Sequence, residues 1–213
     1  MPRQPRNTYE GAFVHVNTRG NDRQGVYFDR ADRLAFLQIF DRLQSKYEWV
    51  VYAWVLMTNH FHLLATPSYP DSVARAMQQT GRRYVPYFNR RHDRTGGLWE
   101  GRYRAHLVDT EQYWFRCLRY IELNPVRASL TSSPRDHPWS SYHANACGAT
   151  DKLLNPHALY IGLGQTALER QAAHRSLIGT PLTEAELASI RNAMRTGLSG
   201  AELPEAALLP VAS

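Results

Sequence analysis

The chain of 213 residues has little cysteine, little lysine and no long apolar run. Two cysteines, Cys117 and Cys147, are too few for a disulfide framework and are expected to be buried, reduced thiols. Because no stretch of 18 apolar residues occurs, no membrane-spanning helix is expected. The first residues, MPRQPRNTYEG, lack an apolar segment after their basic residues, which argues against a secretory signal. These absences predict a cytoplasmic protein.

The positive charge of the chain is almost entirely arginine. Of its 25 basic residues only Lys46 and Lys152 are lysines, and the net charge is +6. Eight arginines fall between residues 75 and 104, with two acidic residues and five aromatic residues among them. Guanidinium groups can contact phosphates while aromatic rings stack on bases, so this pattern is typical of a surface for single-stranded nucleic acid. A solvated helix face followed by core aromatics is the alternative interpretation.

Hydrophobic periodicity predicts a regular order of strands and helices over the first 124 residues. Strands are expected at residues 12–19, 49–57, 60–66 and 98–108, and helices at residues 29–47, 71–89 and 109–124. The first helix is expected to bury Leu34, Leu37, Phe40 and Leu43, and Pro86 is expected to kink the second or end it early. This order is that of a ferredoxin-like βαββαβ unit, an α+β fold whose antiparallel sheet carries helices on one face.

The remainder of the chain has a different composition. Residues 131–156 are rich in serine, proline, asparagine and glycine and predict a loop. Two helices are expected after it, one at about residues 165–178 and one from Thr183, where Glu186 completes a capping box. The last dozen residues are expected to be poorly anchored. We therefore predict one domain over residues 1–145 and a helical C-terminal extension over residues 146–213.

His60 and His62 are the most distinctive chemical feature of the sequence. Alternate residues of a strand point to the same face, so the two imidazoles are expected to emerge together while Phe61 faces the other way. Two imidazoles that lie this close can share one metal ion. Two histidines on a partly solvated sheet face would also explain the pattern.

The helix expected at residues 109–124 supplies further candidates. Tyr120 and Asn124 are four residues apart and therefore project from one face. An asparagine carbonyl oxygen can complete the protein ligands of a metal and leave positions open for water and a phosphate oxygen. A tyrosine beside that metal can act as a nucleophile once it is activated. Tyr113, on the same face, is an alternative nucleophile, and Tyr120 could equally be an ordinary aromatic of an amphipathic helix.

Five segments resemble one known family. Residues 53–64 (AWVLMTNHFHLL) resemble the HUH motif of single-tyrosine transposases. Residues 119–128 (RYIELNPVRA) resemble the tyrosine-bearing helix of their REP-associated branch. Residues 17–23 (NTRGNDR), 97–103 (GLWEGRY) and 139–142 (WSSY) are also similar to segments of that family. The resemblance covers roughly residues 10–200.

The resemblance implies a ferredoxin-like nuclease domain within residues 1–145. His60, His62 and Asn124 would bind Mg²⁺ or Mn²⁺, and Tyr120 would attack single-stranded DNA to leave a 5′-phosphotyrosine link and a free 3′-OH. A different 3′-OH would then reverse the attack and rejoin the strands. The DNA would be a hairpin of the repetitive extragenic palindrome (REP) type, and the protein would act as a nucleoid-associated cytoplasmic monomer rather than a homodimer.

Nine side chains are predicted to contact this DNA, because they combine basic charge with flat rings. They are Arg19, Arg82, Arg83, Arg90, Arg91, Trp99, Arg102, Tyr103 and Arg104. Two other functions fit the same residues. A regulator or relic that binds hairpins without cleaving them would not need the histidines and Tyr120 to converge. A metal-dependent phosphodiesterase that uses water would keep the histidines and would not need Tyr120.

Overall fold

The computed structural model describes residues 8–199 and is built around one four-stranded antiparallel sheet. The strands, in the sheet order β2-β3-β1-β4, are β2 (Trp49–Leu56), β3 (His60–Pro67), β1 (Val14–Arg19) and β4 (Arg104–Leu107). Helix α1 (Arg30–Tyr47) follows β1, α2 (Ser72–Arg91) follows β3, and α3 (Glu111–Glu122) follows β4. This is the predicted βαββαβ order with a further helix, so the ferredoxin-like α+β fold is confirmed.

Strand register brings polar residues of three strands together. β1 lies between β3 and β4, with Arg19 opposite His60 on one side and His15 opposite His106 on the other. β2 and β3 form the hairpin that the sequence predicts, with a two-residue turn at residues 58–59. Because β1 and β3 are antiparallel neighbours, the start of β3 lies beside the end of β1.

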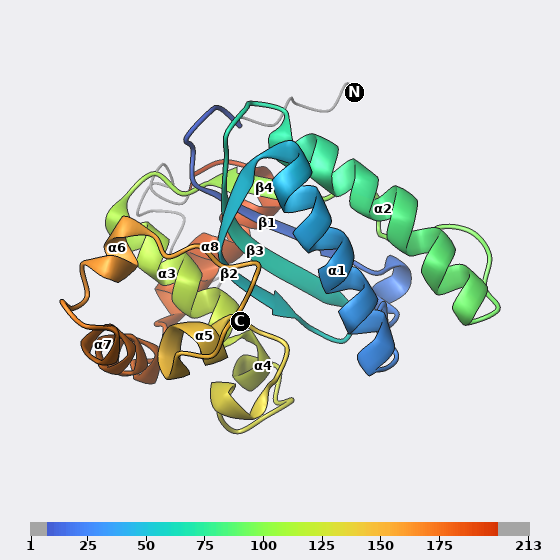
Figure 1. Cartoon of the computed structure of the whole chain (residues 1–213). Helices are drawn as coiled ribbons and strands as arrows, with labels where there is room; N and C mark the ends of the chain where they lie inside the picture. Colours follow the sequence, from blue (N-terminus) through green and yellow to red (C-terminus); the bar gives the residue numbers. More distant parts are fainter. Residues whose placement is uncertain (1–7, 200–213) are drawn as a thin grey trace, which may run out of the picture.

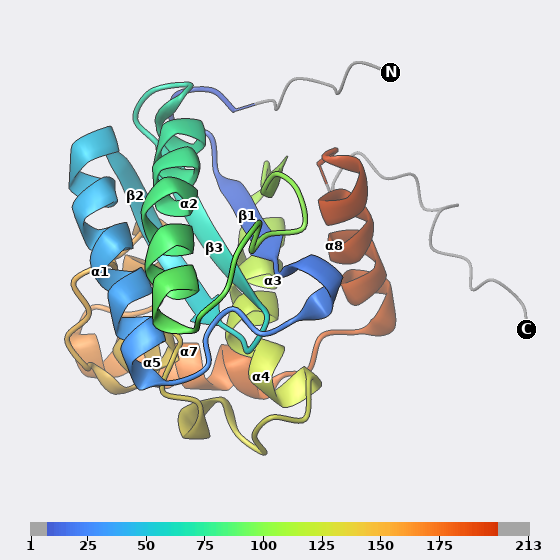
Figure 2. The same cartoon turned by 90° about the vertical axis from the view of Figure 1, so that its right-hand side faces the viewer.

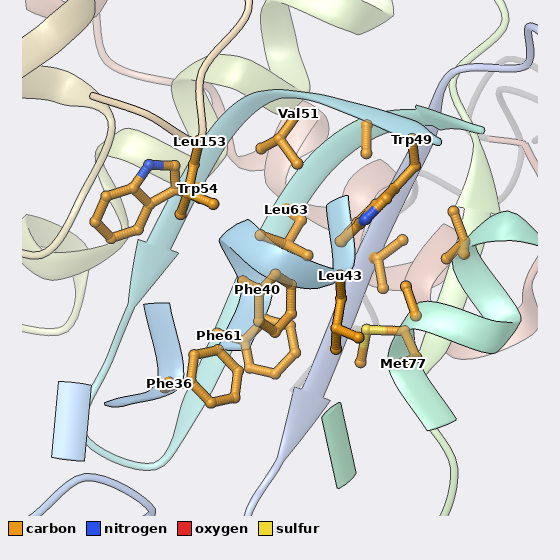
Figure 3. Close-up of a cluster of buried hydrophobic side chains, with 14 of the residues drawn as sticks. Phe36, Phe40, Leu43, Trp49, Val51, Trp54, Phe61, Leu63, Met77 and Leu153 are labelled. Atoms are coloured by element: carbon orange, nitrogen blue, oxygen red, sulfur yellow. The ribbon is translucent and has the colours of Figure 1, made fainter. Parts of the chain in front are cut away.

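Helices α1 and α2 lie side by side over one face of the sheet, as Figures 1 and 2 show. Between them and the strands lies an apolar core with Phe36, Phe40, Trp49 and Phe61 at its centre (Figure 3). The predicted burial of Leu34 is wrong, because this side chain is 40% exposed. Positions 36, 40, 43 and 47 define the buried face, and residue 34 lies about half a turn away from it.

An ion-pair cluster joins the start of α1 to the end of α2. Asp29 caps α1 by accepting a hydrogen bond from the backbone N–H of Asp32 at 3.0 Å. The side-chain carboxylates of Asp29 and Asp32 each pair with Arg91 at 2.6 Å. The predicted early end of the second helix is wrong, because α2 runs through Pro86 to Arg91. Buried Phe88 and the Arg91 ion pairs hold its last turn in place, which offsets the hydrogen bond that a proline cannot donate.

The opposite face of the sheet is covered by α3 and by α8 (Glu184–Thr196), which the sequence did not predict to lie there (Figure 2). A second core forms here, in which Val55 and Leu64 of the sheet meet Ile121 of α3 and Ile190 of α8. Alternate residues of β2 and β3 supply the two cores, as the period of a strand requires.

The C-terminal region contains more helix than predicted. The segment expected to be a loop holds α5 (Tyr142–Cys147), because Tyr142 and Ala146 are buried against Ile178 of a later helix. Next come α6 (Ala158–Ile161) and α7 (Ala167–Gly179), and then α8, whose predicted capping box between Thr183 and Glu186 is present. The last dozen residues lie outside the described part of the chain. The division of the chain at residues 145 and 146 stays a prediction.

Three smaller expectations need correction. β4 is shorter than residues 98–108, because the chain before Arg104 forms a loop with only an isolated bridge between Trp99 and Gly20. Helix α3 ends two residues early, and the short helix α4 (Asn124–Arg127) follows, because Pro125 needs no backbone donor in a first turn. Cys117 is buried as expected, but Cys147 is exposed at the end of α5. Within residues 8–199 no helix has the length and apolarity to cross a bilayer.

Candidate active site

His60 and His62 stand at the start of β3 and project from the same face of the sheet. Their ring centroids are 5.1 Å apart, whereas Phe61 packs into the core beneath α1. His62 is buried, with 3% exposure, and His60 is partly exposed. The alternation of a β-strand therefore produces the pair of imidazoles.

Helices α3 and α4 bring Tyr120 and Asn124 to this pair. The ring centroid of Tyr120 lies 5.5 Å from that of His62. Asn124 makes a side-chain hydrogen bond with His60. Tyr120 and Asn124 are each only 7% exposed, so both side chains are packed inside the protein. The structure thus brings together the predicted nucleophile and all three predicted metal ligands.

Tyr113, the alternative nucleophile, lies in a different environment. Its side chain is 2% exposed, and its hydroxyl lies 3.1 Å from Nε2 of His106. Burial raises the pKa of this phenol well above its ordinary value, which opposes its ionisation. Tyr113 does not line the cavity that Tyr120 shares with His60 and His62. The geometry therefore favours Tyr120 over Tyr113.

Hydrogen bonds orient the two imidazoles. Nδ1 of His60 lies 2.7 Å from Oδ1 of Asn59, and Nδ1 of His62 lies 2.9 Å from Nε2 of His15. Each ring therefore uses Nδ1 for a protein contact, which leaves Nε2 as its possible metal-binding atom. A second ring nitrogen fixed in this way is the usual arrangement for a histidine that binds a metal. Nε2 of His60, Nε2 of His62 and the carbonyl oxygen of Asn124 form a set of two nitrogens and one oxygen, which fits a divalent ion.

The turn after β1 fixes the position of His60 through hydrogen bonds with its neighbour Asn59. The backbone N–H of Gly20 donates to the carbonyl oxygen of Asn59 at 2.7 Å, and Nδ2 of Asn59 donates to the carbonyl oxygen of Arg23 at 2.8 Å. A side chain at Gly20 would collide with the backbone carbonyl of Gln24, so the turn requires glycine. Residues 17–23 (NTRGNDR) thus keep Asn59 in place, and Asn59 in turn orients His60.

A cavity of about 250 Å³ opens beside the two central imidazoles and Tyr120. Its lining includes His60, His62 and Tyr120, and four arginines, which are Arg19, Arg102, Arg104 and Arg191. One acidic residue, Glu100, also lines it and pairs with Arg19 at 2.7 Å. The excess of positive charge favours a polyanionic ligand such as a nucleic-acid backbone.

Both central imidazoles are held in the neutral form. Burial, together with the charge of Arg19, lowers the pKa of His60 to about 4. Burial and the neighbouring His15 and His60 hold the pKa of His62 well below its ordinary value. A neutral imidazole has a free lone pair, which is the form that binds metal. Metal binding at this site would therefore not compete with protons near neutral pH.

Buried histidines should make the fold sensitive to acid. Burial lowers the pKa of His106 to about 3, against 6.5 in the unfolded chain, and His15 and His62 shift in the same direction. Below pH 6.5 the unfolded chain therefore binds protons that the folded chain does not. The free energy of unfolding should fall as pH decreases from 6.5 toward 4, by up to about 1.4 kcal/mol per pH unit for each such imidazole.

Urea unfolding at several pH values measures this slope. A His106→Gln variant, which cannot take up a proton at this position, should show a shallower loss of stability over the same range. A free energy of unfolding that stays constant between pH 6.5 and pH 4 would contradict the neutral, buried state of these rings.

Arg127 is a residue of the site that the sequence reasoning missed. Its guanidinium carbon lies 4.1 Å from the centroid of the Tyr120 ring, and Nη2 donates to the carbonyl oxygen of Tyr120 at 2.7 Å. A cation held over the face of an aromatic ring is attracted to it, so Arg127 both orients this phenol and adds positive charge beside it. The signal was present in the segment RYIELNPVRA, since residues 120 and 127 are two helical turns apart and share a face.

Three further contributors could not be predicted from local sequence. His15 comes from β1 and contacts His62, with 5.8 Å between its ring centroid and that of Tyr120. Arg191 and Met194 come from α8, whose position over this face is a matter of tertiary packing. The C-terminal extension thus contributes to the wall of the cavity.

The nine predicted DNA-contacting residues occupy several places. Arg19, Arg102 and Arg104 line the cavity at the histidines. A neighbouring cavity of about 500 Å³ is lined by Arg82, Trp99, Arg102 and Tyr103, together with residues of α2 and β3. Arg83 and Arg90 are exposed on α2, and Arg91 is occupied by its ion pairs with the start of α1. Arg102 and Thr18 line both cavities, so the two are adjacent.

The chain is similar to known proteins in both sequence and fold. The chain is 26% identical over 120 residues to a putative REP-associated tyrosine transposase of Haemophilus influenzae, which covers 51% of this chain and 67% of that protein. Its fold is similar to the structure of a REP-associated tyrosine transposase bound to a REP hairpin, with a TM-score of 0.57 and 18% identity over 74% of this chain and 93% of that one. The family described as "Transposase IS200 like" matches residues 8–124, more than half of the sequence. The chain belongs to the IS200-like transposase family.

Proposed function

We propose that this transposase cleaves and rejoins single-stranded DNA at hairpin sequences through a covalent bond to Tyr120. The observation that carries the proposal is the convergence of Tyr120, His60 and His62 at one basic cavity, with Asn124 hydrogen-bonded to His60. A binding protein that no longer cleaves would have no need of this combination. The relative whose structure holds a REP hairpin supports a hairpin as the substrate.

The reaction exchanges one phosphate ester for another. Oη of Tyr120 attacks the scissile phosphorus, the bond to the 3′ oxygen breaks, and that oxygen leaves with a proton as a free 3′-OH. The product is a 5′-phosphotyrosine. In the reverse direction another 3′-OH attacks the same phosphorus, and the tyrosine regains its proton. No external energy is consumed, because the number and kind of bonds are conserved.

His60, His62 and Asn124 would hold the divalent ion, Mg²⁺ or Mn²⁺. When bound, such an ion polarises the scissile phosphate and neutralises part of its charge. The arginines of the cavity wall would hold the phosphates on either side. The site is complete within one chain, since α3 delivers Tyr120 to the histidines of its own sheet, and this supports action as a monomer.

Arg127 would assist by holding Tyr120 in place and by adding positive charge where the phosphate is attacked. We expect Arg127→Ala to slow formation of the covalent adduct by roughly 10²-fold, the usual effect of removing one preorganised charge or donor. Arg42→Ala, on an exposed position of α1 across the sheet, is the matched control. Equal rates in both variants would remove Arg127 from the mechanism.

The test of the proposed function is a covalent capture experiment. The protein is incubated with labelled single-stranded hairpin DNA and Mn²⁺ and separated on a denaturing gel. We expect a band in which label and protein migrate together, and none when a chelator is present. Binding without a covalent band would point to a non-catalytic hairpin-binding protein, and cleavage without the band to a phosphodiesterase that uses water.

A further inference from the structure

Three buried metal-ligand side chains lie together behind the candidate active site. They are His15 on β1, His106 on β4 and Cys117 on α3. One possible ligand atom from each lies within 4.8 Å of the others, and the exposures are 0%, 2% and 0%. None of the three belongs to the set formed by His60, His62 and Asn124.

The two imidazoles in this cluster have unused ring nitrogens. Nε2 of His15 contacts His62, and Nε2 of His106 contacts the hydroxyl of Tyr113. Nδ1 of each ring is buried and has no hydrogen-bond partner among residues 8–199. A buried polar atom without a partner is costly, so a fold rarely keeps two of them side by side. A bound ligand or ion that contacts both Nδ1 atoms would explain why no protein group is paired with them.

We propose that His15, His106 and Cys117 bind one Zn²⁺-type cation, at a second metal site distinct from the catalytic one. Two imidazole nitrogens and a thiolate sulfur are a common ligand set for zinc, whereas Mg²⁺ and Mn²⁺ prefer oxygen. On binding, a metal–sulfur bond forms and the thiol proton of Cys117 passes to solvent, with no change of oxidation state. The hydroxyl of Tyr113, which lies 3.1 Å from Nε2 of His106, would fix the orientation of that imidazole while its Nδ1 faces the ion.

The distances are compatible with this assignment. Ligand atoms around a tetrahedral zinc lie roughly 3.5 Å from one another, given bond lengths of about 2.0–2.3 Å. The three ligand atoms, at up to 4.8 Å, would need to approach by about 1 Å, which small rotations of the side chains can supply.

Such an ion would have a structural role beside the catalytic centre. It would join β1, β4 and α3 in one place, three residues before Tyr120 on the same helix. His15 also contacts His62, so the ion would fix both the helix with the nucleophile and the imidazole that faces it. Zinc bound only to the folded state would raise the stability of the fold.

Cobalt absorption tests the site independently of DNA cleavage. Co²⁺ replaces Zn²⁺ in such sites and, when a thiolate binds it, gives an intense sulfur-to-cobalt charge-transfer band. Tag-free protein with Cys147→Ser has Cys117 as its single thiol, so a band in that variant must come from Cys117. We expect this band at one equivalent of Co²⁺, its displacement by Zn²⁺, and its persistence in His60→Ala. No band in the Cys147→Ser protein would overturn the proposal.

Thermal unfolding provides the second measurement. Zn²⁺ should raise the melting temperature of the wild-type protein and of Cys147→Ser, and the increase should be smaller in Cys117→Ser and in His106→Gln, where only the catalytic site remains to bind the ion. An equal increase in all four proteins would also overturn the proposal, because zinc would then bind elsewhere. If Cys117→Ser does not fold, the cobalt spectrum of Cys147→Ser still decides the question.

Discussion

Tyr120→Phe is expected to abolish the covalent protein–DNA adduct while leaving hairpin binding within a few-fold of wild type. The substitution removes one oxygen atom from a side chain that is 7% exposed, so the ring still packs beneath Arg127 and against His62. Loss of a catalytic nucleophile lowers rates by on the order of 10⁴–10⁶-fold in comparable enzymes. The measurement is the covalent capture gel, together with a binding titration at the same ionic strength.

Tyr113→Phe is the matched control for this prediction. It removes a buried hydroxyl that contacts His106 and should cost about 1–2 kcal/mol of stability without removing the adduct. If the adduct persists undiminished in Tyr120→Phe and disappears in Tyr113→Phe, the two tyrosines have the opposite roles and the interpretation of the cavity is wrong.

His60→Ala and His62→Ala are expected to remove metal-dependent cleavage. A bound divalent ion stabilises the charge that develops in the transition state by several kcal/mol. When the ion is lost, cleavage at saturating DNA should therefore fall on the order of 10²–10⁴-fold. Higher concentrations of Mn²⁺ should partly restore His60→Ala, because His62 and Asn124 remain to bind the ion. His62→Ala should be restored less, since it also removes the contact with His15.

His143→Ala on α5 is the control for the two histidine variants. His143 is partly buried and does not line the cavity, so its loss should leave the Mn²⁺ dependence unchanged. Cleavage by His60→Ala and His62→Ala at the wild-type rate and the wild-type Mn²⁺ concentration would exclude them as metal ligands.

The parts of the fold that the sequence predicted are those that local patterns determine. Strand alternation placed His60 and His62 on one face, and the i, i+4 relation placed Asn124 one turn beyond Tyr120. The start of α1 at Asp29 and the capping box of α8 were predicted because side-chain caps are local contacts. These patterns operate within a few residues, so no tertiary information was needed.

The missed features depend on contacts between distant segments. The position of α8 over the second face of the sheet, which brings Arg191 to the cavity, has no local signal. The continuation of α2 through Pro86 depends on ion pairs with the start of α1, and a sequence pattern shows only the proline. His15 was read as part of a strand, and its contact with His62 follows from the register of β1 against β3.

Peptide mapping of the covalent complex tests the central claim most directly. After nuclease trimming and digestion with trypsin, Tyr120 falls in the peptide of residues 120–127 and Tyr113 in the peptide of residues 105–116, and each peptide contains one tyrosine. The account predicts that the mass of the nucleotide remnant is found on the peptide of residues 120–127. A remnant on the peptide of residues 105–116, or on any other peptide, would contradict the assignment of Tyr120 as the residue that attacks DNA.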